Sequence, residues 1–166
     1  MKPIAIFAGI VLVGLALIVG GLHLTDHSAS ATPPPPLPTP LSHAQFVQAA
    51  NRVCQRELRE SKARGLRHPK IKNLRTLTRD FRLAVPLFDR EFAGVRVLMP
   101  PRSEAARFRH LITILGAAQR NAHGILHALQ TRQIGRAFSL SRQQDVLDKR
   151  ANAISRKLGL TVCAKS

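Results

Sequence analysis

Four stretches of the chain after residue 41 repeat apolar residues at alternating intervals of three and four, the spacing of one helix face. They cover roughly residues 42–65, 74–98, 103–131 and 135–158. Long helices joined by short connections run antiparallel to their neighbours. The pattern therefore predicts an all-α fold, an antiparallel up-down four-helix bundle over residues 42–166.

Local signals predict where these helices begin. Ser42 with Gln45 forms the pattern of a capping box, and Leu41 and Phe46 are placed to form a hydrophobic staple around it. Ser103 is expected to cap the third helix in the same way. The first and third helices are therefore expected to begin just after these serines.

Glycine and proline predict where the helices end or bend. Gly65 is expected to stop the first helix, and Gly159, followed by the apolar Leu160, is expected to stop the fourth. Pro86 removes a backbone donor within the second helix, so a kink is expected there. The third helix has a poorly marked end, and we expect a break between Arg132 and Gly135.

The N-terminal region has the pattern of a membrane-targeting segment. Residues 4–22 are uncharged and mainly apolar, and at about 1.5 Å per residue they nearly span a hydrocarbon core of about 30 Å. After Lys2 the next Lys or Arg is Arg52, so the positive-inside bias predicts a single-pass cell-membrane protein with the N-terminus inside and the C-terminus outside. A small-x-small pattern ending at Ala31 leaves a cleaved signal peptide open, in which case the protein is secreted.

The proline-rich stretch at residues 32–40 predicts a stiff polyproline II spacer rather than a helix. Three parts follow: residues 1–25 as the transmembrane anchor or signal peptide, residues 26–41 as a Pro-rich extracytoplasmic linker, and residues 42–166 as the bundle. Both readings of the N-terminus place the bundle outside the cytoplasm.

The chain has two cysteines, Cys54 and Cys163. A tail that turns back at Gly159 brings Cys163 towards Cys54, and an oxidising compartment favours a disulfide between them. A metal pair or a redox couple is typically spaced as Cys-x-x-Cys, and that spacing is missing.

Three short motifs carry a resemblance. They are the early Cys54, the connection Leu98-Met99-Pro100-Pro101 and the terminal Leu158-Gly159-Leu160-Thr161-Val162-Cys163. With these the chain, over about residues 42–163, resembles a group of exported helical proteins of high-GC Gram-positive bacteria, most of them uncharacterised. The resemblance implies a four-helix fold and a disulfide, and it implies no activity.

The region after Pro40 holds 25 Lys or Arg and 8 Asp or Glu, so it carries the whole formal charge of +17. Such a field favours polyanions, anionic lipid or an acidic protein as partners. The densest basic run extends from Arg56 to Arg82, and we expect it at or near the bundle end far from the anchor. The basic surface expected to bind comprises Arg67, Lys70, Lys72, Arg75, Arg79 and Arg82.

Catalytic and metal-binding motifs are sparse. His123 and His127 stand four apart on one helix face, a spacing compatible with two metal ligands, but the zincin glutamate is missing. Glu91 falls on the apolar face of the second helix, where an ion pair with an arginine is the plainest interpretation. The sequence also lacks a nucleophile elbow, a P-loop and a dinucleotide fingerprint. We therefore expect no enzyme, no cofactor and no metal.

These observations lead to one expectation and three alternatives. We expect a non-enzymatic, membrane-anchored extracytoplasmic protein whose basic surface binds an anionic envelope polymer, lipid or an acidic partner. One alternative is an accessory or sensory subunit packed against a membrane protein. Another is a bundle that binds a small ligand or a metal. Nucleic acid is the third, and it is disfavoured because the protein is expected outside the cell and lacks Tyr and Trp for base stacking.

Overall fold

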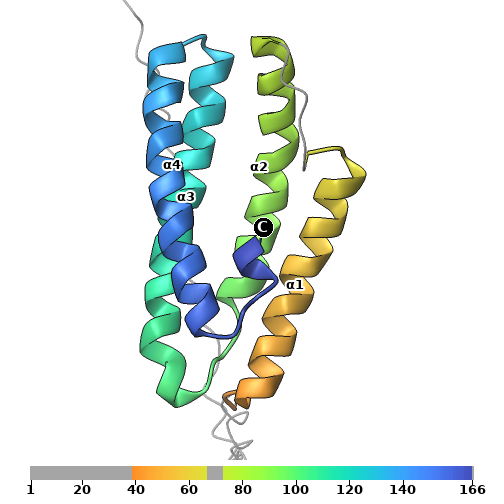
Figure 1. The fold of residues 1–166 in the computed structure, drawn as a ribbon, viewed down its shortest axis with the longest axis vertical. Coiled ribbons are helices and arrows are strands. Elements are labelled where there is room, and N and C mark those ends of the chain that lie inside the picture. The colour runs from red at the N-terminus through yellow and green to blue at the C-terminus, as the bar shows by residue number, and fades with distance from the viewer. Residues whose placement is uncertain (1–38, 67–72, 166) are drawn as a thin grey trace, which may run out of the picture. The chain divides into compact units, whose positions relative to one another are not determined.

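The computed structural model describes residues 39–66 and 73–165. These residues form four long helices, α1 (His43–Ala63), α2 (Leu74–Arg96), α3 (Ala105–Gln130) and α4 (Ile134–Lys157). Two single 3₁₀ turns accompany them, η1 (Arg102–Glu104) before α3 and η2 (Cys163–Lys165) at the C-terminus. Successive helices run in opposite directions (Figure 1), so the described part of the chain is an all-α, up-down helical arrangement.

The first helix begins and ends as predicted. The Ser42 hydroxyl accepts a hydrogen bond from the Gln45 backbone and the Gln45 side chain accepts one from the Ser42 backbone, which completes the capping box. At the other end Gly65 adopts a φ of +70°. The Leu66 N–H donates to the carbonyl of Ser61, the long hydrogen bond of a Schellman motif.

The second helix begins with a cap that the sequence pattern did not predict. Asn73 and Thr76 form a reciprocal capping box, with Thr76 in the place where Glu or Gln is usual. The helix continues through Pro86 as one element and ends at Arg96, ahead of Pro100 and Pro101.

The predicted cap at Ser103 is wrong. Ser103 lies inside the 3₁₀ turn η1, and α3 begins at Ala105 without any side-chain cap. The turn is closed by a hydrogen bond from the Glu104 N–H to the carbonyl of Pro101. Because the two prolines fix the approach of the chain, this tight turn supplies the start that a serine cap was expected to supply.

The fourth helix ends as predicted. Gly159 adopts a φ of +74°, and the N–H of Leu160 donates to the carbonyl of Ser155. Leu160 is fully buried, so the turn at Gly159 sends the tail back along the molecule and seats it on apolar side chains.

The core consists of two clusters at opposite ends of the helices. The larger one joins all four helices and the tail, and it contains an edge-to-face pair in which the ring centroids of Phe46 and Phe108 are 5.2 Å apart. The smaller one gathers Ile125, Ala128 and Leu129 of α3 with Ala137 of α4. Burial of these apolar side chains is the main favourable contribution to folding.

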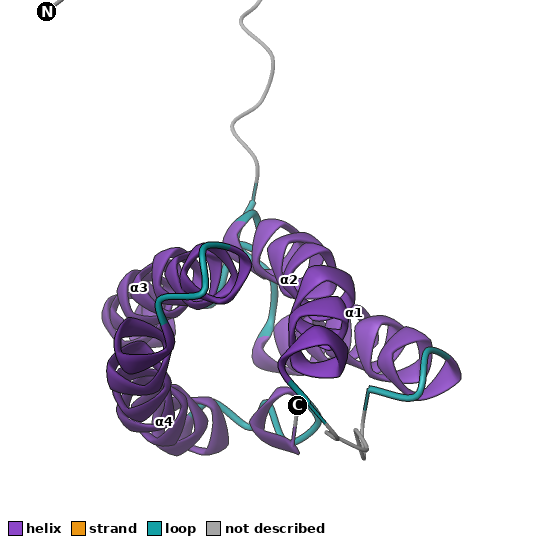
Figure 2. Cartoon of the chain, turned by 90° about the horizontal axis from the view of Figure 1, so that it is seen from above, coloured by secondary structure: helices purple, strands orange, loops and turns teal. Residues whose placement is uncertain are grey.

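The four helices do not close into a ring. α1 packs against α2, α2 against α3 and α3 against α4, whereas no Cα atom of α4 comes within 8 Å of one in α1 or α2. The 3₁₀ turn η2 contacts both α4 and α1 and completes that side, as the end-on view shows (Figure 2). The predicted up-down order therefore holds, but α1 and α4 are joined through the C-terminal tail instead of by direct packing.

A disulfide between Cys54 and Cys163 anchors this tail, as predicted from the cysteine positions. The two Cα atoms are 5.1 Å apart and the bond joins the middle of α1 to η2. Close by, the N–H of Val162 donates to the side chain of Asn51, 3.1 Å away. The tail is thus held on α1 by one covalent bond and one hydrogen bond.

A buried carboxylate links α1 to α2. Glu57 is only 3% exposed, and its two oxygens accept hydrogen bonds from Arg56 at 3.0 Å and Arg90 at 3.1 Å. The hydrogen bond that Arg90 donates to Glu57 raises the pKa of Arg90, which also pairs with Glu60. A buried charge needs such partners, so this cluster fixes how α1 and α2 face each other.

The expected anchor at residues 1–25 and nearly all of the expected linker at residues 26–41 lie outside the described residues. Within residues 39–66 and 73–165, none of the helices combines the length and apolar character that a membrane crossing requires.

Replacing both cysteines by alanine is expected to lower the free energy of unfolding by about 2–4 kcal/mol, because the bond closes a long loop. The separation of the cysteines is 109 residues. Chemical denaturation followed by circular dichroism measures the change, and the native helical signal should persist. Reduction of the unaltered protein is the matched control and should give a similar loss. Equal stability of the oxidised and reduced protein would contradict the prediction.

Candidate anion-binding site

Three of the six predicted basic-surface residues lie in the described part of the chain. Arg75, Arg79 and Arg82 occupy the first half of α2, and all three are exposed. Arg67, Lys70 and Lys72 lie outside the described residues. The end of α2 that carries these arginines is opposite the end of the described bundle where α1 begins (Figure 1).

The three arginines line an open hollow of about 780 Å³ where the start of α2 meets the end of α3. A fourth arginine, Arg132, lines it from the turn between α3 and α4. The other lining residues are Asn73, Leu74, Thr78, Leu129 and Gln130. Among the described residues, the lining therefore contains four guanidinium groups and no carboxylate, which makes the hollow a cationic depression.

Arg132 was not predicted as a site residue, and its backbone is unusual. It has a φ of +57°, the left-handed conformation that favours glycine. Its N–H donates to the carbonyl of Leu129 and the Gln133 N–H donates to that of Ala128, so Arg132 occupies the glycine position of a Schellman motif. The nearest glycine in the sequence, Gly135, lies one turn further on, inside α4.

The charges around the hollow are not equally available. Arg79 donates to one oxygen of Asp80 through two nitrogens, at 3.0 and 2.9 Å, and Asp80 is buried. Part of the Arg79 charge is therefore committed to the fold. Among the described residues, no ion pair joins an acid to Arg75, Arg82 or Arg132. The positive end of the α2 dipole lies on the same side and adds to the field.

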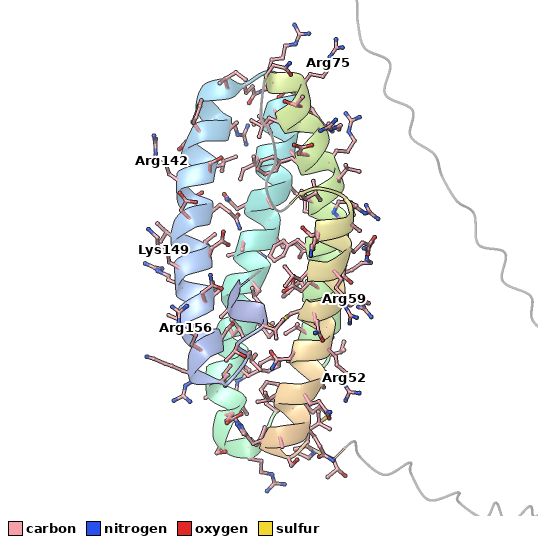
Figure 3. The ribbon with its side chains drawn as sticks, turned by 45° about the vertical axis from the view of Figure 1, so that its right-hand side comes forward. Arg52, Arg59, Arg75, Arg142, Lys149 and Arg156 are labelled. Atoms are coloured by element: carbon pink, nitrogen blue, oxygen red, sulfur yellow. A yellow bond between two sulfur atoms is a disulfide. The ribbon has the colours of Figure 1, made fainter. Side chains whose placement is uncertain are left out.

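The remaining basic residues do not share one face. Figure 3 shows Arg52 and Arg59 projecting from α1 and Arg142, Lys149 and Arg156 from α4, while Arg75 lies at one end of the molecule. The positive charge is thus spread around the helices. What distinguishes the α2 arginines is that a concave surface brings them together with Arg132.

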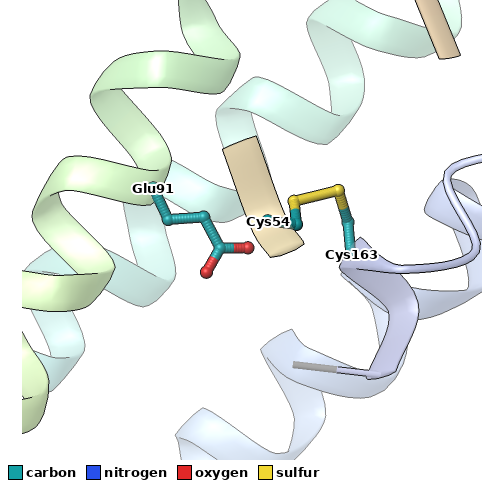
Figure 4. Close-up of side chains that lie close together, drawn as sticks. All are labelled: Cys54, Glu91 and Cys163. Carbon is teal, nitrogen blue, oxygen red and sulfur yellow. A yellow bond between two sulfur atoms is a disulfide. The ribbon is translucent and has the colours of Figure 1, made fainter. Parts of the chain in front are cut away.

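The histidine pair and Glu91 serve other purposes. His123 pairs with the carboxylate of Asp89, 3.0 Å away, instead of sharing a ligand site with His127. Glu91 points from α2 towards the disulfide (Figure 4), and one of its oxygens lies within 4.8 Å of both sulfur atoms. Those sulfurs are bonded to each other, so this group is not a set of metal ligands.

Comparison of the chain with protein-family models, with curated proteins and with solved structures finds no match. The assignment of a role therefore rests on the geometry of the hollow and on its charge.

Arg132→Gly is expected to stabilise the protein by about 1 kcal/mol, because glycine adopts the left-handed conformation without the steric cost that arginine has. Arg132→Gln is the matched control, since it removes the same charge but keeps a side chain at this φ. Thermal and chemical denaturation of the three proteins measure the difference. If the glycine and glutamine variants prove equally stable, backbone strain at Arg132 is refuted.

Proposed function

We propose that this protein is a non-enzymatic, membrane-anchored extracytoplasmic protein that binds an anionic polymer of the cell envelope through the arginine hollow. The observation that carries the proposal is the convergence of Arg75, Arg79, Arg82 and Arg132 on one concave surface whose described lining holds no carboxylate. Guanidinium groups bind phosphate and carboxylate oxygens in pairs, so such a surface suits these anions.

A polymer suits the hollow better than a single small anion. An exposed ion pair contributes only about 0.2–1 kcal/mol, so one phosphate in an open depression binds weakly. A chain of repeated anions engages several arginines at once, and it also meets the basic residues on the neighbouring helices. The formal charge of +17 raises the encounter rate with any such chain.

The position of the hollow agrees with an anchored protein. The hollow lies at the end of the helices opposite Ser42, through which the chain reaches its N-terminal segment. A tether at Ser42 therefore leaves the hollow accessible. Anionic lipid and an acidic protein are the other ligands that the same charge suits, and the experiment below includes both.

An accessory or sensory subunit is the second candidate, favoured by exposed apolar side chains on α4. Ile134, Phe138 and Val146 are 39%, 66% and 48% exposed, and the first two stand four residues apart on one side of the helix. Large exposed apolar side chains that lie together are typical of protein contacts. Recovery of one stoichiometric partner after mild solubilisation, and its loss in Phe138→Ser, distinguishes this candidate from polymer binding.

The combined variant Arg75→Gln, Arg82→Gln, Arg132→Gln is expected to weaken binding to labelled polyphosphate on the order of tenfold or more, because three exposed ion pairs are lost. Arg79 is left in place because it neutralises the buried Asp80. Fluorescence anisotropy at several salt concentrations measures the affinity, and binding should weaken as salt rises.

The matched control is Arg142→Gln, Lys149→Gln, Arg156→Gln, which removes the same charge from exposed positions on α4. It should weaken binding much less. Equal losses in the two variants would show that the net charge binds the polymer and that the hollow does not. Anionic vesicles and polyglutamate in place of polyphosphate show whether lipid or an acidic protein is preferred.

A further inference from the structure

A groove of about 590 Å³ lies on the side of the molecule where α4 leaves α1 and α2 uncovered. Its volume is in the range of about 300–1,000 Å³ that is typical of small-molecule sites. One side is formed by the α2 face that carries Phe81, Ala84 and Phe88, and another by residues of α4. Leu160 and Cys163 of the disulfide-bonded tail also line it.

Apolar side chains that would be buried in a closed bundle remain partly exposed here. Phe81, Ala84, Phe88 and Leu115 are only half-buried, although the apolar periodicity places them on the inner faces of their helices. Because α4 does not approach the α2 face, Phe81, Ala84 and Phe88 have no helix of the described chain covering them. The groove therefore presents apolar surface that an elongated ligand can bury, with about a fourfold gain in affinity for each methylene.

The charges that line the groove are opposite to the charge of the protein. Glu57, Glu91 and Asp148 line it, whereas the described lining contains no Lys, Arg or His. The whole chain has only nine acids against 26 Lys or Arg. A third of the acids thus border one groove in a protein whose surface is otherwise dominated by arginine.

Asp148 is held in place by a relay of amides that starts in the protein interior. The buried Asn121 donates to Gln144 at 2.8 Å and also to the carbonyl of Leu140. Gln144 in turn donates to the carboxylate of Asp148 at 2.9 Å. Partial burial raises the pKa of Asp148, against the lowering effect of the Gln144 bond, and the charge of Asp145 raises it further. A cation beside this carboxylate would relieve both unfavourable effects.

The three carboxylates differ in how far the fold already uses them. Glu57 is committed to Arg56 and Arg90. Glu91 lies deeper in the groove, next to the disulfide (Figure 4). Asp148 is exposed to solvent on one side, and none of the ion pairs among the described residues includes it. Asp148 is thus the carboxylate best placed to meet the charged end of a ligand.

We infer that this groove binds a small amphiphile with a slender apolar body and a protonated amine, the body lying along Phe81, Ala84 and Phe88 and the amine beside Asp148. This site is separate from the arginine hollow and selects the opposite charge. The net charge of the protein repels cations, so a preference for an amine has to arise from the groove itself.

The experiment compares two probes with the same ten-carbon tail, decylammonium and decanol, on the full-length oxidised protein below their micelle concentrations. Isothermal titration calorimetry is expected to show one site with an affinity for decylammonium at least roughly tenfold above that for decanol, because a charge-assisted hydrogen bond is formed. Equal affinities, or tighter binding of decanol, would overturn the assignment of the ligand class.

Two variants locate the site. Asp148→Asn is expected to remove most of the preference for the amine, while Asp145→Asn, the same change on an exposed residue that does not line the groove, should keep it. Ala84→Phe fills the groove and is expected to weaken binding of both probes more than tenfold, with the helical signal unchanged. Unaltered binding in Ala84→Phe, or equal effects of the two asparagine variants, would refute the groove as the site.

The arginine hollow is tested independently by the same proteins. The combined arginine variant should bind decylammonium as the unaltered protein does, and Asp148→Asn should bind polyphosphate at least as well. Failure of one proposal therefore leaves the other standing. Joint loss of amine binding in the arginine variant would count against a separate groove site.

Discussion

The bond between Cys54 and Cys163 is the constraint on which the arrangement of the four helices depends. Among the four long helices, α4 comes into close backbone contact only with α3, so helix pairing by itself does not determine how far α4 stands from α1. The turn at Gly159 and the burial of Leu160 direct the tail into the gap, and the disulfide then secures it to α1. The width of the groove is therefore set by a short cross-linked tail rather than by interlocking helices.

The positions of the charged side chains follow from the free energy required to bury each of them. Burying a carboxylate without a partner is expensive, so Glu57 and Asp80 each have an arginine within hydrogen-bond distance. Exposed arginines have no such requirement and repel one another, which accounts for their spread over α1, α2 and α4 (Figure 3). The exceptions are informative, because four arginines line one hollow and three acids line one groove.

Local patterns predicted most of the helices, and their failures have physical causes. The capping box at Ser42 and the glycine turn at Gly159 depend on neighbours in sequence, so they could be read directly. Ser103 failed because two prolines before it favour a tight turn that replaces a capped start. A break near Arg132 was expected, but the left-handed conformation of Arg132 could not be predicted because glycine, its usual signal, lies three residues further on.

The candidate sites were less predictable because they depend on distances between helices. Periodicity identified one α2 face as an inner face, and in the structure this face does line the groove. It contains Phe81, Ala84, Phe88 and Glu91. It carries no information on whether another helix covers that face, since this is decided by the tail and the disulfide. The hollow likewise needed Arg132, which is fifty residues from Arg82 and reaches it only through the pairing of α2 with α3.

The two sites also explain why the net charge is a poor guide to function on its own. A charge of +17 attracts anions to the whole surface, and it therefore cannot select one position over another. A site can select its ligand only where the local charge or shape of the surface differs from the average over the protein. The hollow departs by concentrating guanidinium groups on a concave surface where Arg132 tolerates an unfavourable backbone. The groove differs from the rest of the surface because its described lining contains no basic side chain. Its carboxylate Asp148 is also held in place by a chain of amide hydrogen bonds that begins at the buried Asn121.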